Sequence, residues 1–187
     1  MIAAYFRERF PVRVFVPLAA GLALAASGGS FDALRFAEDA CAALLLLAEF
    51  RLLDDLADRR SDSVTHPGRV LVNAPTIRPF LWVCVLLFAA NLGISVAIAT
   101  TVSLPVLLAL HAALSAWYLT RTRRTIGGDQ LLLAKYPAFV VIDAGPRIAT
   151  APLSIAAGAL AVYAAVSLYE AWHDPASPLA ALLGGRS

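Results

Sequence analysis

Long apolar stretches alternate with short polar connections along the chain. A membrane-spanning helix needs roughly 20 mostly apolar residues, with tolerance down to about 17. Six stretches come near this length, at 12–27, 31–53, 80–102, 104–119, 131–148 and 152–172. The connections at 27–30 and 100–103 leave room only for tight turns between antiparallel helices. The pattern predicts an all-α transmembrane bundle of about six spans that forms a single domain over residues 1–187.

The composition agrees with a membrane protein. Charged residues make up 15% of the chain and hydrophobic residues 60%, whereas a soluble domain carries about 25% charged residues. These values exclude disordered, fibrous and disulfide-rich classes and argue against a soluble globular enzyme. The net charge of +2 gives no indication of a nucleic-acid partner. Cys41 and Cys84 lie in apolar stretches and are expected to be small buried hydrophobes, not a disulfide or a metal pair.

Arginines are distributed unevenly among the connections. Cytoplasmic loops of membrane proteins retain positive charge. Most arginines precede the first stretch, or follow the second and the fourth: Arg7, Arg9, Arg13, Arg51, Arg59, Arg60, Arg69, Arg78, Arg121, Arg123 and Arg124. The opposite connections contain Arg35 and Arg147. This asymmetry predicts an integral protein of a bacterial-type inner membrane with both termini in the cytoplasm.

A different interpretation applies to the N-terminal region. The arginines at 7–13, the apolar run after them and Ala23-Leu24-Ala25 together resemble a secretory signal with a cleavage site. Cleavage there would leave five spans. A first helix that is retained as an anchor instead gives a charge pattern that is consistent along the whole chain.

An aspartate-rich cytoplasmic segment is expected at 54–78, and no helix breaker precedes Pro67, so the second span should continue into it. At about 100° per residue, its carboxylates share one arc that also contains Arg51; they belong to Asp54, Asp55, Asp58 and Asp62. Mg²⁺ is typically held by one or two carboxylates together with phosphate, and arginine binds phosphate in a bidentate manner. The stripe therefore fits a diphosphate bound through Mg²⁺. The alternative is a solvated helix end with Asp55–Arg59 and Asp58–Arg51 pairs.

The motif Asp54-Asp55-x-x-Asp58-x-x-x-Asp62, followed by His66-Pro67-Gly68-Arg69, resembles the first aspartate-rich motif of the UbiA superfamily of intramembrane prenyltransferases. That motif begins with Asn-Asp, so Asp54 replaces the asparagine and the other three aspartates match. The resemblance implies a UbiA-like helical fold whose active site opens to the cytoplasm. It also implies transfer of an isoprenoid group from a prenyl diphosphate to an aromatic or lipid acceptor, with Mg²⁺ on the four aspartates and diphosphate on Arg51 and Arg69.

Other parts of the family pattern are missing or weak. Family members have about nine spans and a second Asp-x-x-x-Asp motif after the sixth, where this chain has Glu170, His173 and Asp174 near Trp172. These residues fit an ordinary helix end with an interfacial tryptophan better than a second ligand set. Two copies or a partner subunit would then complete the site, or the protein binds a lipid diphosphate without turnover. No catalytic residue is assigned.

Ionisable and polar residues within the apolar stretches are functional candidates, because such groups are costly at membrane depth. Lys135 lies level with the aspartate stripe and either contacts the diphosphate or snorkels to the interface. Asp143 and Arg147 are four residues apart and are expected to form a structural pair. His111 and Asn91 are expected to act as hydrogen-bond partners between helices.

Two further classes are compared with this interpretation. Alcohol phosphatidyltransferases are similar in size and layout, but their motif requires glycine after the first aspartate, where this chain has Leu56. A plain structural or transport subunit would tolerate asparagine throughout the stripe. Motifs of hydrolases, nucleotide triphosphatases, zinc proteases and thiol enzymes do not occur.

Overall fold

The computed structural model describes residues 1–97, 102–121 and 125–173, and every regular element within these ranges is an α-helix. The helices are α1 (Ile2–Arg9), α2 (Val12–Ala26), α3 (Ala33–Thr65), α4 (Arg78–Ala97), α5 (Ser103–Thr120), α6 (Ile126–Leu133), α7 (Lys135–Ala144), α8 (Arg147–Thr150) and α9 (Pro152–His173). The predicted all-α class is confirmed. The turn expected at 100–103 falls largely outside the described residues.

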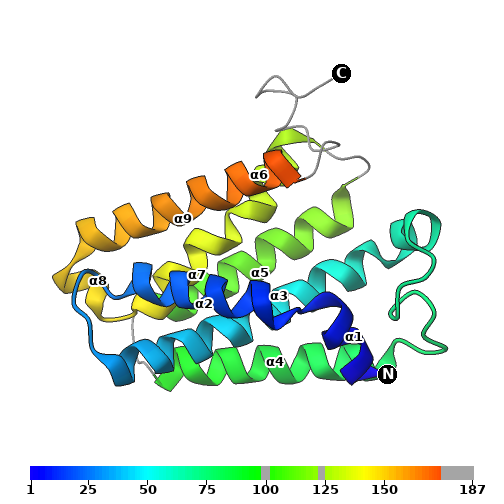
Figure 1. Ribbon diagram of the computed structural model, residues 1–187, viewed down its shortest axis with the longest axis horizontal. Coiled ribbons are helices and arrows are strands. Elements are labelled where there is room, and N and C mark those ends of the chain that lie inside the picture. The colour runs from blue at the N-terminus through cyan, green and yellow to red at the C-terminus, as the bar shows by residue number, and fades with distance from the viewer. Residues whose placement is uncertain (98–101, 122–124, 174–187) are drawn as a thin grey trace.

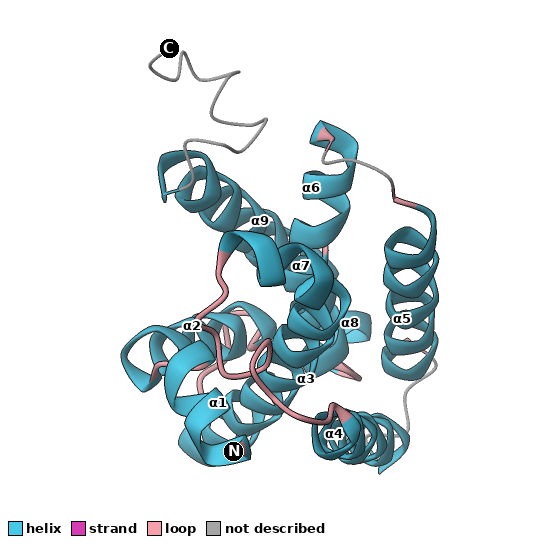
Figure 2. Cartoon of the chain, turned by 90° about the vertical axis from the view of Figure 1, so that its right-hand side faces the viewer, coloured by secondary structure: helices cyan, strands magenta, loops and turns pink. Residues whose placement is uncertain are grey.

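The long helices run side by side, and α1 lies across one end of the bundle (Figure 1). Helix α2 packs against α3, α7 and α9, while α4 packs against α3 and α5. Pro11 separates α1 from α2, which meet at a bend of 70°, because proline lacks the N–H that would continue the helix. Viewed from the end of the bundle, α1 lies beside α2 and α3 (Figure 2).

Within the part of the chain that the structure describes, three helices are long and apolar enough to cross a membrane: α4, α5 and α9. A fourth span is added if the bent pair of α1 and α2 is counted as one. These helices are consistent with a membrane protein, but the six spans expected from the sequence are not confirmed. Helix α3 is long enough, yet Arg35, Glu38 and Asp39 interrupt its apolar run near the beginning.

The stretch expected to form the fifth span is divided into three shorter helices. Helix α6 ends at Leu133 and α7 begins at Lys135, with a helical turn at Ala134 between them. Pro137 in the first turn of α7 has no N–H to donate to the carbonyl of Leu133, which accounts for the break. Gly145, with a φ of +52°, then ends α7, because glycine adopts this conformation without a steric penalty.

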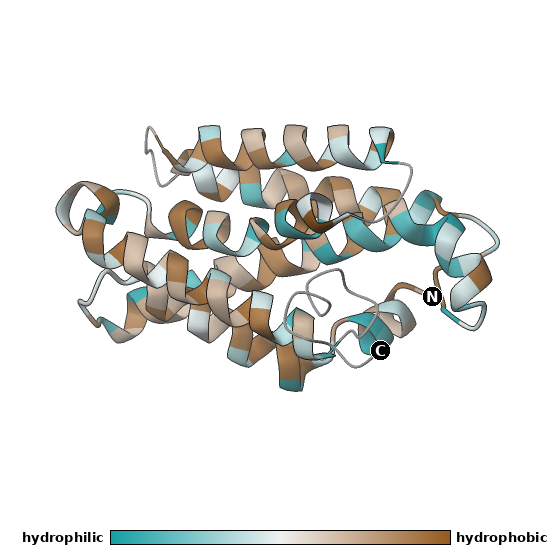
Figure 3. Ribbon diagram, turned by 90° about the horizontal axis from the view of Figure 1, so that it is seen from above, coloured by the Kyte–Doolittle hydropathy of each residue, from teal (hydrophilic) through white to brown (hydrophobic). Residues whose placement is uncertain are grey.

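Helix α3 carries the aspartate stripe and is continuous over 33 residues, which corresponds to about 50 Å. The Asp32 carboxylate caps its beginning by accepting the Arg35 N–H at 2.8 Å. It ends at Thr65, shortly before Pro67, so the expected continuation of the second span is confirmed. Figure 3 shows polar residues gathered where α3 leaves the bundle, whereas the helix bodies are mainly apolar.

Two apolar clusters hold the fold together. The larger joins α2, α3, α5, α7 and α9 through side chains such as Leu22, Leu46, Phe50, Leu114 and Phe139. In the smaller cluster, α1 and the connection at 66–77 pack against α3 and α4 through Tyr5, Leu52, Leu71 and Phe80. Cys41 is exposed and Cys84 is half-buried, so the expectation of two buried cysteines is wrong, because Cys41 faces outward from α3.

Helices α2 and α9 approach closely at Gly158, where an added Cβ would lie 2.9 Å from the Ala25 carbonyl oxygen. We expect Gly158→Ala to lower the stability in detergent by about 1–3 kcal/mol, because backbone must shift to admit the methyl group. Gly21→Ala on α2 is the matched control, since nothing lies within 4 Å of the added atom. Equal thermal midpoints for the two variants would contradict this account.

Candidate functional site

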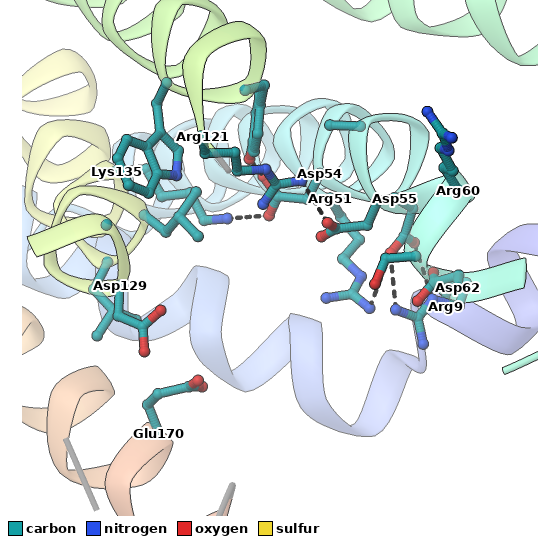
Figure 4. A pocket seen from close by; sticks show the side chains of 18 of the residues that line it. Arg9, Arg51, Asp54, Asp55, Arg60, Asp62, Arg121, Asp129, Lys135 and Glu170 are labelled. Atoms are coloured by element: carbon teal, nitrogen blue, oxygen red, sulfur yellow. Dashed lines mark hydrogen bonds and ion pairs between the residues drawn. The ribbon is translucent and has the colours of Figure 1, made fainter. Parts of the chain in front are cut away.

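A cavity of about 1090 Å³ lies at the end of the bundle where α3 emerges. Its walls come from α1, α3, α5, α6, α7 and α9 (Figure 4). All seven residues selected from the sequence line it: Arg51, Asp54, Asp55, Asp58, Asp62, Arg69 and Lys135. The helical periodicity of the stripe therefore placed these carboxylates correctly on one face. Each of them contacts a basic side chain from another part of the fold.

Asp54 connects α3 to α5 and α7. Its Oδ2 pairs with the Lys135 ammonium at the start of α7, and its Oδ1 accepts the Tyr118 hydroxyl near the end of α5. The Lys135 side chain is only 10% exposed, so it turns into the cavity and does not snorkel toward solvent. The expected position of Lys135 beside the stripe is confirmed, and its contact with diphosphate stays a prediction.

Asp55 ties α1 to α3. Its Oδ2 accepts the Tyr5 hydroxyl at 2.8 Å and Arg9 Nε at 2.9 Å, while its Oδ1 accepts Arg9 Nη2 at 2.8 Å. Arg51 Nη2 lies 3.3 Å from the same Oδ1. With its side chain 6% exposed, Asp55 has both oxygens engaged, which suits it to hold α1 in place.

Asp58 and Asp62 lie farther along the same face. Asp58 Oδ1 pairs with Arg121 Nη2 just beyond α5, and Asp62 Oδ2 pairs with Arg69 in the connection after α3. His66 Nδ1 lies 3.6 Å from the other Asp62 oxygen. The Asp58 side chain is 42% exposed, so this is the carboxylate of the stripe that an incoming ligand reaches with least displacement of protein atoms.

Burial raises the pKa of both Asp55 and Asp58 above the ordinary value of an aspartate, because the surrounding protein disfavours the charged carboxylate. Arg9 and Arg121 act in the opposite direction on Asp55 and Asp58, respectively, and compensate only in part. These two carboxylates therefore take up protons at a higher pH than an exposed aspartate does. Any cation that binds them competes with those protons.

Charges of the two signs are balanced around the cavity. Among the described lining residues, the acidic ones are Asp54, Asp55, Asp58, Asp62, Asp129 and Glu170, and the basic ones are Arg9, Arg51, Arg60, Arg69, Arg121 and Lys135. Asp129 of α6 and Glu170 of α9 lie at the opposite end of the cavity from Asp62, and Arg60 points away from the carboxylates (Figure 4). A lining with equal numbers of the two signs fits a ligand whose own charges nearly cancel.

The carboxylate oxygens are of the kind that Mg²⁺ prefers. However, no three His, Cys, Asp or Glu side chains in the described part of the chain converge as ligands of one ion. Mg²⁺ that shares its shell with phosphate needs only one or two carboxylates. The residues therefore fit a metal that arrives with a diphosphate better than a metal held by protein alone.

Several pairings expected from the sequence differ in the structure. Arg59 does not pair with Asp55; it donates to the carbonyl oxygens of Leu71 and Val72, at 3.1 and 3.4 Å. Arg51 pairs with Asp55 in place of Asp58. Arg59 bonds to the connection at 66–77, and Arg51 shares Asp55 with Arg9 of α1. Spacing along α3 alone does not reveal either arrangement.

The expected Asp143–Arg147 ion pair is also wrong. Arg147 Nη1 pairs with Asp39 of α3 at 2.7 Å, and its contact with Asp143 is a 2.6 Å hydrogen bond to the main-chain carbonyl. Gly145 ends α7 between the two residues, so they do not share the continuous helix that the pairing assumed.

Sequence reasoning missed the contribution of α1 to the site. Tyr5 and Arg9 are four residues apart and therefore share one face of a helix, which is the signal that could have identified them. It also missed Asp129 as a lining residue, since nothing local connects α6 to the stripe on α3. The basic residues Arg123 and Arg124, and the possible ligand Asp174, lie outside the described residues.

No protein-family model, curated protein or solved structure matches the chain. The resemblance to the UbiA superfamily accordingly rests on the aspartate motif and on the residues that follow it.

Proposed function

We propose that this chain binds a prenyl diphosphate together with Mg²⁺ in the cavity and transfers its isoprenoid group to an aromatic or lipid acceptor, as a UbiA-like protein. The observation that carries the proposal is the convergence of the α3 carboxylates with basic side chains from four other segments on one cavity (Figure 4). An apolar bundle adjoins this cavity and offers a surface for an isoprenoid tail.

Binding would exchange the partners that the charged side chains have now. Arg51, Arg69 and Lys135 pair with carboxylates, and a diphosphate offers them oxygens that suit charge-assisted hydrogen bonds. Asp58, together with Asp54 or Asp62 once this exchange releases it, would then hold the metal. When bound, Mg²⁺ supplies positive charge that stabilises the departing diphosphate. Asp55 keeps its contacts with α1 and closes the end of the site.

The inner wall of the cavity is suited to the carbon skeleton next to the diphosphate. Leu132, Leu133, Tyr118 and Tyr136 line it. The Arg121 guanidinium lies 4.8 Å from the centre of the Tyr118 ring, and Lys135 Nζ lies 5.6 Å from that of Tyr136. The faces of these rings attract cations. Movement of Lys135 to the diphosphate would free the Tyr136 face for the positive charge that develops on the isoprenoid.

Orientation follows from the arginine distribution. With both termini in the cytoplasm of an inner membrane, the cavity opens to the compartment in which prenyl diphosphates are soluble. The lipid bilayer surrounds the outward faces of α4, α5 and α9, where exposed apolar side chains such as Trp82, Leu108 and Leu160 gather. A second copy or a partner subunit would supply any further ligands that transfer requires.

Binding without turnover is the second candidate. It is favoured by the departure from the family pattern at 170–174, where Glu170, His173 and Asp174 stand in place of a second Asp-x-x-x-Asp motif. In that case the protein holds a lipid diphosphate, or a partner membrane protein carries out the chemistry.

Release of diphosphate separates the two candidates. Purified protein in detergent is incubated with radiolabelled farnesyl diphosphate and Mg²⁺, and free diphosphate is measured over time. The transferase predicts release that stops when EDTA is added. Mg²⁺-dependent binding without release supports the second candidate, and neither binding nor release refutes both.

The pH dependence of binding gives a further prediction. Metal binding requires ionised carboxylates, and burial raises the pKa of Asp58 above the about 3.9 of an ordinary aspartate. Protons therefore compete with Mg²⁺ at a higher pH than they would at an exposed aspartate, and Mg²⁺-dependent binding should weaken on acidification. Equilibrium binding of farnesyl diphosphate between pH 3.5 and 8 measures this, with circular dichroism confirming the fold at each pH. If Mg²⁺-dependent binding varied with pH in Asp58→Asn as it does in wild type, the role of Asp58 would be contradicted.

A further inference from the structure

Two arginines share one buried carboxylate in the wall of the cavity. Asp55 Oδ1 lies 2.8 Å from Arg9 Nη2 of α1 and 3.3 Å from Arg51 Nη2 of α3. All three residues line the cavity, and both guanidinium groups point at Asp55 (Figure 4). The two arginines therefore compete for one negative charge, so the strength of the Arg9 contact determines how firmly Arg51 is held.

Arg9 is the more strongly bound of the two. Its Nε donates to Asp55 Oδ2 at 2.9 Å and its Nη2 donates to Oδ1 at 2.8 Å. This is the bidentate geometry in which arginine binds a carboxylate most strongly. Tyr5, one helical turn before Arg9, donates its hydroxyl to Oδ2 at 2.8 Å. Helix α1 alone thus supplies Asp55 with a counter-charge and with hydrogen bonds to both of its oxygens.

Arg51 is held more loosely. Its contact with Asp55 is the longer one, and its Nε is buried without a hydrogen-bond partner in the described part of the chain. The Arg51 side chain is 32% exposed, compared with 18% for Arg9. Arg51 therefore has donors to spare for an anion in the cavity, and it loses less than Arg9 when it leaves Asp55.

The Asp55 charge is costly if it has no partner. Burial raises the pKa of this carboxyl group, and the hydrogen bonds and charge of Arg9 act in the opposite direction. Without Arg9, the cation already in contact with Asp55 is Arg51. An ionised Asp55 would then draw Arg51 into a closer pair, and the same guanidinium group would be less available to a ligand.

We propose that Arg9 is a positioning residue of the diphosphate site, which neutralises Asp55 and so leaves Arg51 free to bind diphosphate. This inference rests on the proposed function, because it concerns the same cavity. Arg9 acts through Asp55 and Arg51 and does not itself contact the ligand. Helix α1, which lies across the end of the bundle (Figure 1), thereby sets the affinity of a site built mainly on α3.

A purely structural role for Arg9 predicts a different result. Other contacts also hold α1: the rings of Tyr5 and Phe80 lie 5.5 Å apart, and the Glu8 carboxylate accepts the Val70 N–H at 2.9 Å. If Arg9 only stabilised the fold, its replacement would lower the thermal midpoint and leave the affinity of the folded protein unchanged.

Equilibrium binding of farnesyl diphosphate with Mg²⁺ separates these roles. The protein in nanodiscs is titrated at pH 8, where Asp55 is ionised, and well below the thermal midpoint of each variant. We expect Arg9→Ala to weaken binding about 10-fold, as for the loss of a hydrogen bond to a charged group. The exposed Arg7→Ala on the same helix is the matched control and should bind like wild type. Equal affinities for Arg9→Ala and Arg7→Ala would overturn the inference.

Two double variants test the route through Asp55 and Arg51. Asparagine at position 55 has no charge that could draw Arg51 away, so Arg9→Ala with Asp55→Asn should regain an affinity near that of wild type. In an Arg51→Ala background, Arg9→Ala should weaken binding no further. Failure of the first variant to recover, or full additivity in the second, would overturn the inference.

A further variant covers the case in which Arg9→Ala does not fold. Arg9→Gln keeps a hydrogen-bond donor for Asp55 but removes the positive charge, so it should also bind more weakly than Arg7→Ala. Wild-type protein that does not bind farnesyl diphosphate refutes the proposed function, and this inference with it. Wild-type binding that is unchanged in Arg9→Ala or Arg9→Gln refutes the inference alone.

Discussion

Asp58→Asn is expected to weaken Mg²⁺-dependent binding of farnesyl diphosphate by about 100-fold, since even outer partners of a metal site contribute 10–100-fold to affinity. Asp58 is the most accessible carboxylate of the stripe, with 42% of its side chain exposed. Asparagine keeps the shape and removes the charge that a cation needs. Binding isotherms with and without Mg²⁺ measure the effect.

The matched control for this substitution is Glu38→Gln on the same helix. Glu38 forms an exposed pair with Arg35 at 3.1 Å, near the opposite end of α3, and such pairs contribute little to stability. We expect this variant to bind like wild type. The Asp58→Asn protein should also keep its thermal midpoint, because its partner Arg121 is partly solvated. Equal affinities for Asp58→Asn and Glu38→Gln would contradict a metal role for Asp58.

Arg9→Ala is expected to lower the stability of the protein in detergent by about 3 kcal/mol. The change removes both hydrogen bonds from the Arg9 guanidinium to the Asp55 carboxylate. The Asp55 side chain is only 6% exposed, so its negative charge then lacks its main positive partner. Breaking a buried pair from one side costs about 3–5 kcal/mol, and the remaining Arg51 contact reduces the loss. Thermal unfolding of the purified variant measures it, with the exposed Arg7→Ala as control on the same helix.

A double variant separates the ion pair from other effects of the substitution. With Asp55→Asn present, the uncompensated charge is gone, so Arg9→Ala should cost much less than it does alone. Full additivity of the two single changes would show that α1 is held by apolar contacts such as that of Tyr5 with Phe80, whose ring centres are 5.5 Å apart. The link between Asp55 and α1 would then have no energetic importance.

The aspartate stripe could be predicted because it depends on information within one helix. The period of the α-helix and the absence of a breaker before Pro67 are local properties, and they placed Asp54, Asp58 and Asp62 on one face correctly. Lys135 was placed beside them because it lies near the cytoplasmic end of the expected fifth span at 131–148. The all-α class followed from the length and apolarity of the stretches.

The partners of these residues could not be predicted in the same way, because they depend on how separate helices pack. Arg9 reaches Asp55 only because Pro11 bends α1 back over the end of α3. Arg147 finds Asp39 on another helix in place of its near neighbour Asp143. Glu49 falls inside the second apolar stretch at 31–53, and its neighbours Asn91 and His111 come from α4 and α5.

The most direct test of the central claim is equilibrium binding of farnesyl diphosphate to the wild-type protein in nanodiscs, with Mg²⁺ and then with EDTA. The account predicts saturable binding that requires Mg²⁺ and is displaced by inorganic diphosphate, because the cavity recognises the charged group. Binding that is equally strong in EDTA, or no saturable binding under either condition, would contradict it. The charged network around α3 would then serve only to hold the helices together.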